Sequence, residues 1–394
     1  MHRRDLLQTG LAAALSARLL PQAVAQTPAP AAARKLIVDA YSRHLQWLRT
    51  PDEVAEAAAE MGYQGLDITV VPYPGHVDPE KVATDLPPYV NAARRQGLRV
   101  TSMRCTITDA DTPNADNILR TASSLGLTHY WGGMFRYDLN KPIIEQLDAL
   151  KLRIAKLVPL LEKYNMTAMY HTYSGSASVG AAIWDFLYVL KNFDPKHVGF
   201  HYDIGHMTDA GYASWDLNLR AAGPYIAGVS CKDSVIELNL PIEGGGPYTG
   251  PPNLGGRGGG APGGSGGFAG PGGGGRGPAG ASGGRGAGGR GGGGAAAGGR
   301  GGGAAAGGRG GGGAANPWRI RQVPLGEGID NLPLLGSILM QMGFNGPIEI
   351  QAEYPNGGAN NAADKITLPR AQVLGAMKRD LLVLRTAFSQ SGWA

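Results

Sequence analysis

The feature that most constrains this sequence is an alternation, repeated eight times, of a short β-like run and a longer helical segment. The β-like runs are residues 36–40, 65–70, 98–103, 128–131, 167–171, 198–203, 226–232 and 347–353. The helical segments are residues 51–61, 78–96, 114–125, 143–164, 179–190, 215–222, 332–342 and 371–387. Eight such repeats favour parallel strands, and eight parallel strands close into a (β/α)8 TIM barrel. An open doubly wound sheet is the alternative, but it usually has fewer repeats, and no Gly-x-Gly-x-x-Gly motif follows the first run.

The helical segments carry local start and stop signals. Thr50 stands before Pro51 and Asp78 stands before Pro79, which places proline at the first helical position behind a capping residue. Gly97 follows the second helical segment, where a glycine suits the left-handed residue after a helix. These signals support the helical segments independently of their hydrophobic pattern.

A glycine-rich segment interrupts the seventh repeat. Of the 64 glycines in the 394 residues, 40 fall between Gly244 and Gly313. This composition cannot bury a core, so we predict a disordered low-complexity insertion over residues 244–316, after the seventh strand. The predicted barrel then consists of residues 35–243 and 317–390.

The positive charge of the chain lies outside the predicted barrel. The formal net charge is +5, but the glycine-rich segment holds six arginines and no acid, and the first 25 residues contribute +2. The remaining chain therefore carries about −3. Nucleic-acid binding depends on clustered positive charge, so we expect no nucleic-acid partner for the barrel.

The N-terminus has the pattern of an export signal. Arg3 and Arg4 precede a modest apolar run, and Ala23-Val24-Ala25 forms a small-x-small cleavage site. Residues 1–25 resemble a twin-arginine signal peptide, followed by a linker over residues 26–34, and predict a periplasmic or exported protein. No apolar run reaches the ~18 residues of a membrane span, so we predict none.

Polar residues collect where the predicted strands end. Strands of a parallel sheet are normally apolar on both faces, yet four of these runs end in histidine, lysine or a carboxylate. In a barrel, the loops after the strands build one common face, where chemistry takes place. The polar residues at these ends include His44, Arg136, His171, Asp203, His206, Lys232, Asp233 and Glu353.

Four motifs in order carry a family resemblance. They are YDIGHM at 202–207, CKDS at 231–234, VPLGEG at 323–328 and GPIEIQAEY at 346–354. Together they resemble the xylose isomerase-like TIM barrel superfamily, which includes the sugar phosphate isomerases/epimerases, ketose 3-epimerases and inosose dehydratases. The resemblance covers roughly residues 35–233 and 318–384.

The resemblance implies one divalent ion held by residues of strands five to eight. The ligands carried over are His171, Asp203, His206 and Glu353, a nitrogen and oxygen set that suits Mn²⁺, Zn²⁺, Co²⁺ or Mg²⁺. This sequence departs from the family pattern at two places. The acid expected on strand five is missing, with His171 the nearest substitute, and the histidine expected on strand seven is Ser230.

The same resemblance implies an exported sugar isomerase or epimerase that acts on a free or keto sugar through an enediolate. Glu353, His206 and Lys232 are the predicted catalytic residues. The predicted substrate-binding residues are His44, Arg136 and Asp233. Two alternatives remain open: a keto-sugar or keto-inositol dehydratase, and a non-catalytic carbohydrate-binding barrel with a degenerate metal site. A small-molecule carbohydrate is the expected partner in each case.

Overall fold

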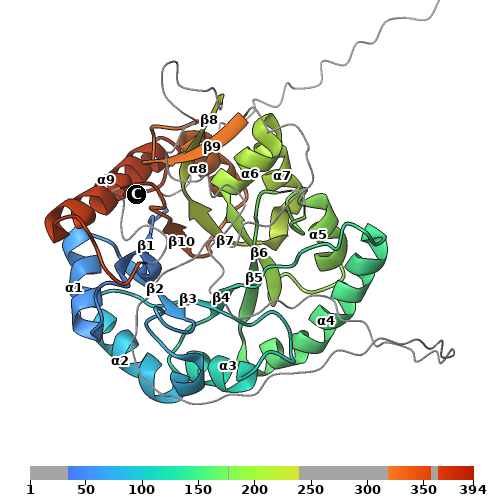
Figure 1. Cartoon of the computed structure of the whole chain (residues 1–394), viewed down its shortest axis with the longest axis horizontal. Helices are drawn as coiled ribbons and strands as arrows, with labels where there is room; N and C mark the ends of the chain where they lie inside the picture. The colour runs from blue at the N-terminus through green and yellow to red at the C-terminus, as the bar shows by residue number, and fades with distance from the viewer. Residues whose placement is uncertain (1–33, 176, 239–317, 356–362) are drawn as a thin grey trace, which may run out of the picture.

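Eight parallel strands form a closed barrel, as predicted. The computed structural model describes residues 34–175, 177–238, 318–355 and 363–394. The strands of the barrel are hydrogen-bonded in the order β1-β10-β7-β6-β5-β4-β3-β2. Their bounds are Asp39–Tyr41 (β1), Gly65–Val70 (β2), Ser102–Cys105 (β3), His129–Gly132 (β4), Thr167–His171 (β5), Val198–Asp203 (β6), Ile226–Cys231 (β7) and Ile348–Ile350 (β10). Figure 1 looks into this ring and confirms the (β/α)8 fold.

Helices surround the barrel on its outer side (Figure 1). Their bounds are Pro51–Met61 (α1), Val82–Arg95 (α2), Ala115–Ser124 (α3), Ile143–Tyr164 (α4), Trp184–Leu190 (α5), Ile204–Gly211 (α6), Trp215–Ala222 (α7), Leu332–Gln341 (α8) and Arg370–Ser389 (α9). Short 3-10 turns lie at Ser42–Leu45, Pro79–Lys81, Tyr212–Ser214 and Gly223–Tyr225. None of the helices among these described residues is long and apolar enough to cross a membrane.

Helix α1 shows how the local signals operate. The Thr50 side chain accepts a hydrogen bond from the Glu53 backbone N–H, and the Glu53 carboxylate accepts one from the Thr50 backbone N–H, which completes a capping box. The helix ends at Gly62, whose φ of 89° is a conformation that glycine adopts without a steric penalty. The predicted range of α1 is therefore the observed one.

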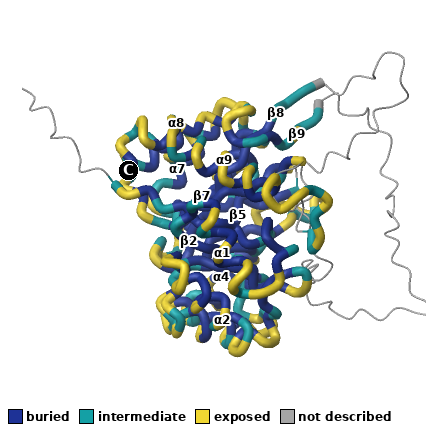
Figure 2. The backbone as a smooth tube through the Cα atoms, turned by 90° about the vertical axis from the view of Figure 1, so that its left-hand side faces the viewer, coloured by how far each residue is buried: buried dark blue, intermediate teal, exposed yellow. Residues whose placement is uncertain are grey.

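Three elements were not among the predicted repeats. Helix α6 follows β6 directly, in a region for which no helix was predicted. Strands β8 (Asp233–Leu238) and β9 (Trp318–Val323) form a separate antiparallel pair. This hairpin stands out from the barrel in Figure 2. The predicted insertion at 244–316, the predicted signal peptide at 1–25 and the linker at 26–34 lie outside the described residues.

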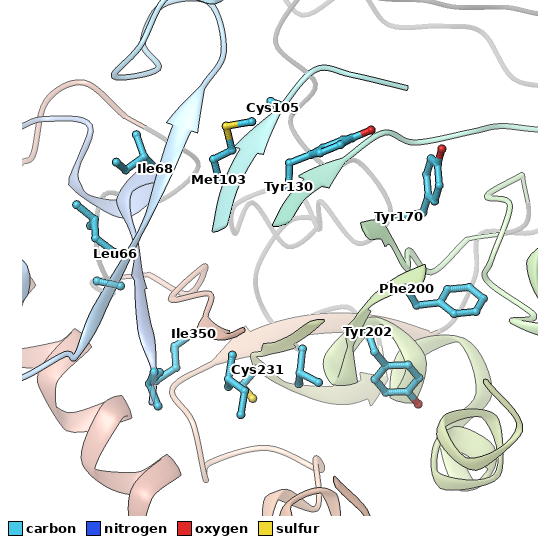
Figure 3. Packing of buried hydrophobic residues seen from close by; sticks show 14 of the residues in the cluster. Leu66, Ile68, Met103, Cys105, Tyr130, Tyr170, Phe200, Tyr202, Cys231 and Ile350 are labelled. Carbon is cyan, nitrogen blue, oxygen red and sulfur yellow. The ribbon is translucent and has the colours of Figure 1, made fainter. Parts of the chain in front are cut away.

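The apolar core lies between the strands and the helices. Figure 3 shows residues of this core, among them Leu66, Met103, Phe200 and Ile350, on the side of the strands that faces the helices. Alternate residues of the same strands point into the barrel, where many of them are polar. Figure 2 shows that the strands of the barrel are buried along most of their length. This arrangement encloses the polar side chains and directs those at the strand ends toward one face.

Candidate functional site

The carboxyl ends of four neighbouring strands bring five predicted site residues together. His171 ends β5, Asp203 ends β6, Lys232 follows β7, and Glu353 follows β10. His206 lies in the first turn of α6, directly after β6. These strands are neighbours in the barrel order β10-β7-β6-β5, so their ends meet at one edge. The structure thus joins all the predicted metal ligands and catalytic residues into one cluster.

Lys232 lies at the centre of the cluster. Its Nζ is 2.8 Å from His206 Nε2, 3.1 Å from Asp203 Oδ2 and 3.3 Å from Glu353 Oε2. The side chain is only 2% exposed. Burial favours the neutral amine, but the carboxylates of Asp203 and Glu353 outweigh that effect and raise the pKa of Lys232. The lysine is therefore a buried, charged ammonium group with three neighbouring acceptor atoms.

The contact with Lys232 determines the tautomer of His206. An ammonium group only donates hydrogen bonds, so His206 Nε2 accepts and carries no proton. The proton of the neutral ring is then on Nδ1, which donates to Ser174 Oγ at 3.1 Å. Burial, followed by the charge of Lys232, lowers the pKa of His206 to about 3. His206 is thus a neutral imidazole with its Nε2 lone pair directed at Lys232.

Asp203 connects the histidines to the lysine. Its Oδ1 accepts a hydrogen bond from the His206 backbone N–H at 2.9 Å and so caps α6. Its Oδ2 lies 3.3 Å from His171 Nε2 and 3.1 Å from Lys232 Nζ. Burial alone would raise the pKa of Asp203, but Lys232 and the two histidines hold it well below its usual range. Asp203 is therefore an ionised carboxylate near neutral pH.

The cluster includes a group that could hold a divalent metal ion. Ligand atoms of His171, Asp203 and His206 all lie within 4.8 Å of one another, and all three residues are buried. Among the described residues, this group has three members. Glu353 is the fourth predicted ligand, but its carboxylate contacts Lys232 instead. A carboxylate oxygen and two imidazole nitrogens are a suitable donor set for first-row divalent metals. Ser230 at the end of β7 is buried and adds only a hydroxyl, without a described partner.

Glu353 is the member of the cluster that reaches the open end. Its side chain is 27% exposed, whereas the side chains of Lys232 and Asp203 are 2% and 0% exposed. Burial would raise the pKa of Glu353, but the charges of Lys232 and His44 outweigh it and lower the pKa to about 2. Glu353 therefore presents an ionised carboxylate to whatever enters the barrel mouth.

The predicted substrate-binding residues have three different environments. His44 is fully buried, packs edge-on against Tyr41 with ring centroids 5.3 Å apart, and has no described hydrogen-bond partner at either ring nitrogen. Arg136 lies in the loop after β4, where its backbone bridges to Ser178. Asp233 accepts hydrogen bonds from the backbone N–H groups of Ser234, Gly326, Gly328 and Asp330 at 2.9–3.1 Å. Substrate contact by these three residues remains a prediction.

The structure adds His201, which the predicted site did not include. His201 Nδ1 is 2.8 Å from His171 Nδ1, and its ring stacks on Trp131 at a centroid distance of 4.5 Å. Trp131 Nε1 in turn donates to Asp67 Oδ2 at 3.0 Å. His201 is two residues before Asp203 on the same strand, so strand alternation already places both side chains inside the barrel. This alternation was the sequence signal for His201.

Comparison with known proteins agrees with this fold. A family model described as "Xylose isomerase-like TIM barrel" matches residues 55–250. The chain is therefore similar to this family over the range that contains strands β2 to β7 of the closed barrel. No curated protein matches the chain in sequence.

Several solved structures share the architecture at low sequence identity. D-psicose 3-epimerase from Clostridium cellulolyticum H10 is 12% identical, with a TM-score of 0.54 over 90% of this chain and 99% of that one. A 3-keto-D-glucoside 4-epimerase from E. coli is 12% identical, with a TM-score of 0.51 over 89% and 100%. The probable 3-DHS dehydratase from Bacillus anthracis is also 12% identical, with a TM-score of 0.51 over 88% and 99%. At this identity the likenesses show a common fold.

Proposed function

We propose that this protein is an enzyme that isomerises or epimerises a sugar by moving a proton beside a carbonyl group. The observation that carries the proposal is the contact of a partly exposed, ionised Glu353 with the buried ammonium of Lys232. A base next to a positive charge is what enediolate chemistry requires, because one accepts the carbon-bound proton and the other stabilises the oxyanion. The superfamily and the sugar epimerases among the structural neighbours support the same reaction class.

The proton transfer involves Glu353 and Lys232. The Glu353 carboxylate takes the proton from the carbon beside the carbonyl, and the electron pair of that C–H bond forms the enediolate double bond. Lys232 donates a hydrogen bond to the carbonyl oxygen, on which negative charge develops. Return of the proton to the other face of the same carbon completes an epimerisation. Its return to the former carbonyl carbon, together with transfer of the proton of the neighbouring hydroxyl group to the former carbonyl oxygen, completes an isomerisation.

Substrate binding also adjusts the strength of the base. In the free site, Lys232 is 3.3 Å from Glu353 and helps to hold its pKa at about 2. When a substrate oxygen takes the hydrogen bond of the ammonium, Glu353 loses part of that positive influence, and its pKa rises toward the usual value. The carboxylate thus becomes a better base when a carbonyl group is in place.

The remaining residues bind and orient the sugar. His44 has two ring nitrogens without described partners and lies close enough to Glu353 to influence its pKa, so it can bind a hydroxyl group beside the reacting carbon. If a divalent ion displaced the Lys232 ammonium, His171, Asp203 and His206 would hold it, and it would supply Lewis-acid polarisation of the substrate oxygens. Mn²⁺, Zn²⁺, Co²⁺ and Mg²⁺ are the ions proposed for this group. Arg136 and Asp233 are the further substrate ligands we propose.

A free or keto sugar is the substrate class we propose. The predicted twin-arginine signal implies a periplasmic or exported location, where phosphorylated intermediates are not expected. A keto-sugar dehydratase is the second candidate, because β-elimination starts from the same enediolate and one structural neighbour is a probable dehydratase. A non-catalytic carbohydrate-binding barrel is the third, since Ser230 stands where the family pattern has a histidine.

Proton NMR in D2O tests the proposal. The panel is D-fructose, D-psicose, D-tagatose and a 3-keto-D-glucoside, the sugars of the structural neighbours. We expect deuterium to enter beside the carbonyl of at least one sugar, and Glu353→Gln to slow this exchange by about 10²–10⁴-fold. Glu327→Gln, a surface variant that loses only an exposed pair with Arg379, is the matched control and should exchange as wild type does.

Three outcomes discriminate between the candidates. Loss of water from the sugar, rather than deuterium exchange alone, would favour the dehydratase. Binding without exchange or elimination would favour the carbohydrate-binding barrel. Exchange that persists unchanged in Glu353→Gln would contradict the role given to this residue.

A further inference from the structure

The donor atoms that could bind a metal already contact a cation. Lys232 Nζ lies 2.8 Å from His206 Nε2 and 3.1 Å from Asp203 Oδ2. These two residues are two of the three members of the possible metal group. A metal bound by His206 Nε2 would need the same lone pair that accepts the hydrogen bond of the ammonium. Lys232 and a divalent ion therefore compete for one position.

The protein is shaped to hold the lysine in this position. A Cβ atom at residue 205 would lie 2.6 Å from Lys232 Cγ and 3.3 Å from Lys232 Cε. Only glycine at that place leaves room for the lysine side chain to pass over the start of α6. Gly205 lies within two positions of Asp203 and His206, two residues that contact the ammonium of Lys232.

The surrounding charges accommodate one cation at this position but not two. The donors of the possible metal group are two neutral imidazoles and one carboxylate, and Glu353 is the other carboxylate within contact of Lys232. One monovalent cation between two carboxylates leaves a small net charge in a buried site. A divalent ion added beside the ammonium would repel it strongly at these distances, because the buried surroundings screen charges weakly.

We propose that Lys232 is the resident cation of this site, and that a divalent metal binds to His171, Asp203 and His206 only after the ammonium has left. Where the proposed function holds, this inference deepens it, since the positive charge that polarises the substrate oxygen is then part of the polypeptide.

A titration with Mn²⁺ alone tests the inference. The full-length protein is first treated with chelator and then titrated in a calorimeter. We expect wild type to bind Mn²⁺ weakly, with a Kd above about 1 mM, and Lys232→Met to bind one ion at least about 100-fold more tightly. Lys191→Met removes an exposed lysine at the end of α5 and should titrate as wild type does. Adding Asp203→Asn to Lys232→Met should abolish the tight binding, because it removes the charged ligand.

The Mn²⁺ titration of the wild-type protein tests the inference even if a variant fails to fold. One equivalent of tightly bound metal in wild type, removable by chelator, would overturn it, as would equal affinities in wild type and a folded Lys232→Met. The deuterium-exchange assay separates this result from the proposed function. Deuterium exchange that requires Mn²⁺ would contradict the inference but not the proposed function. Absence of exchange both with and without Mn²⁺ would contradict the proposed function, whereas the titration would still test the inference.

Discussion

Asp330 is a buried acid whose charge is poorly stabilised by the described residues around it. It is 8% exposed, and neither carboxylate oxygen accepts a well-aligned hydrogen bond from the described residues. Burial, with the nearby charge of Asp233, raises the pKa of Asp330 to about 8. Its folded pKa thus exceeds its unfolded value of about 4. The contribution of protonated Asp330 to the free energy of unfolding is fully present below about pH 4. It decreases as the pH rises and is lost once the pH passes 8.

The Asp330→Asn variant should therefore be more stable than wild type at alkaline pH. An amide stays neutral, so it avoids the cost of a buried, unpartnered carboxylate, which is about 1–3 kcal/mol. Urea unfolding at pH 9 should show this gain, and unfolding at pH 5 should show little difference. Asp148→Asn, on the exposed side of α4, is the control and should behave as wild type at both pH values. The same difference at both pH values would contradict the explanation.

Residue patterns in the sequence predict most residues of the candidate site but not how their side chains are arranged. Asp203, His206, Lys232 and Glu353 were found from motif order, and the structure joins them in one cluster. The position of Lys232 between its neighbours could not be read from the sequence. It depends on the register between strands, in which Asp203 pairs with Ser230, and on the room that Gly205 leaves. Both are properties of the assembled barrel.

At the scale of elements, Asp233 organises the connection between β9 and α8. Its two oxygens accept four backbone hydrogen bonds, three of them from the turn around Gly326, Gly328 and Asp330. Asp233→Ala should lower the free energy of unfolding by about 3 kcal/mol or more, because it leaves several N–H groups without an acceptor. Chemical denaturation measures this loss. In Asp233→Asn, a higher KM for the sugar at unchanged stability would instead support the predicted substrate role.

We predict that residues 239–317 can be deleted without loss of the fold, because they connect the two strands of the β8–β9 hairpin. Leu238 pairs directly with Trp318 in the antiparallel ladder, so the two strand ends are adjacent. Joining them through Asn-Gly, the dipeptide of a two-residue hairpin turn, should keep the fold and change the Tm by only a few degrees. Thermal unfolding followed by circular dichroism checks this result. Loss of the folded state would show that residues 239–317 contribute to stability, and a changed KM alone would show that they influence the site.

Elements with strong local signals were predicted most closely. Helices Pro51–Met61 and Ile143–Tyr164 have the predicted ends, since capping and periodicity act within each segment. The hairpin was missed because its two strands are 79 residues apart in the chain, and only their pairing identifies them. Helix α6 was missed because it has eight residues and begins inside the motif assigned to the strand end.

At the scale of the whole molecule, the barrel separates an apolar outer layer from a polar interior. Asp39, Asp67 and Glu349 are buried inside, and burial raises the pKa of each, to about 6 for Asp39 and about 7 for Asp67. The eight repeats predicted the closed barrel, because alternation and count are properties of the sequence. They did not predict that Asp39 would lie beside Glu349, since that pairing forms only where β1 and β10 close the ring.

The adjacency of Leu238 and Trp318 has a consequence for engineering. Paired residues in an antiparallel ladder have Cα atoms about 5 Å apart, so the chain leaves and re-enters the hairpin at nearly the same point. A guest domain whose own termini lie close together could be spliced in there without altering the distance that the barrel must span. A reporter or an affinity module would then be carried at the rim of the barrel, on the hairpin that follows β7.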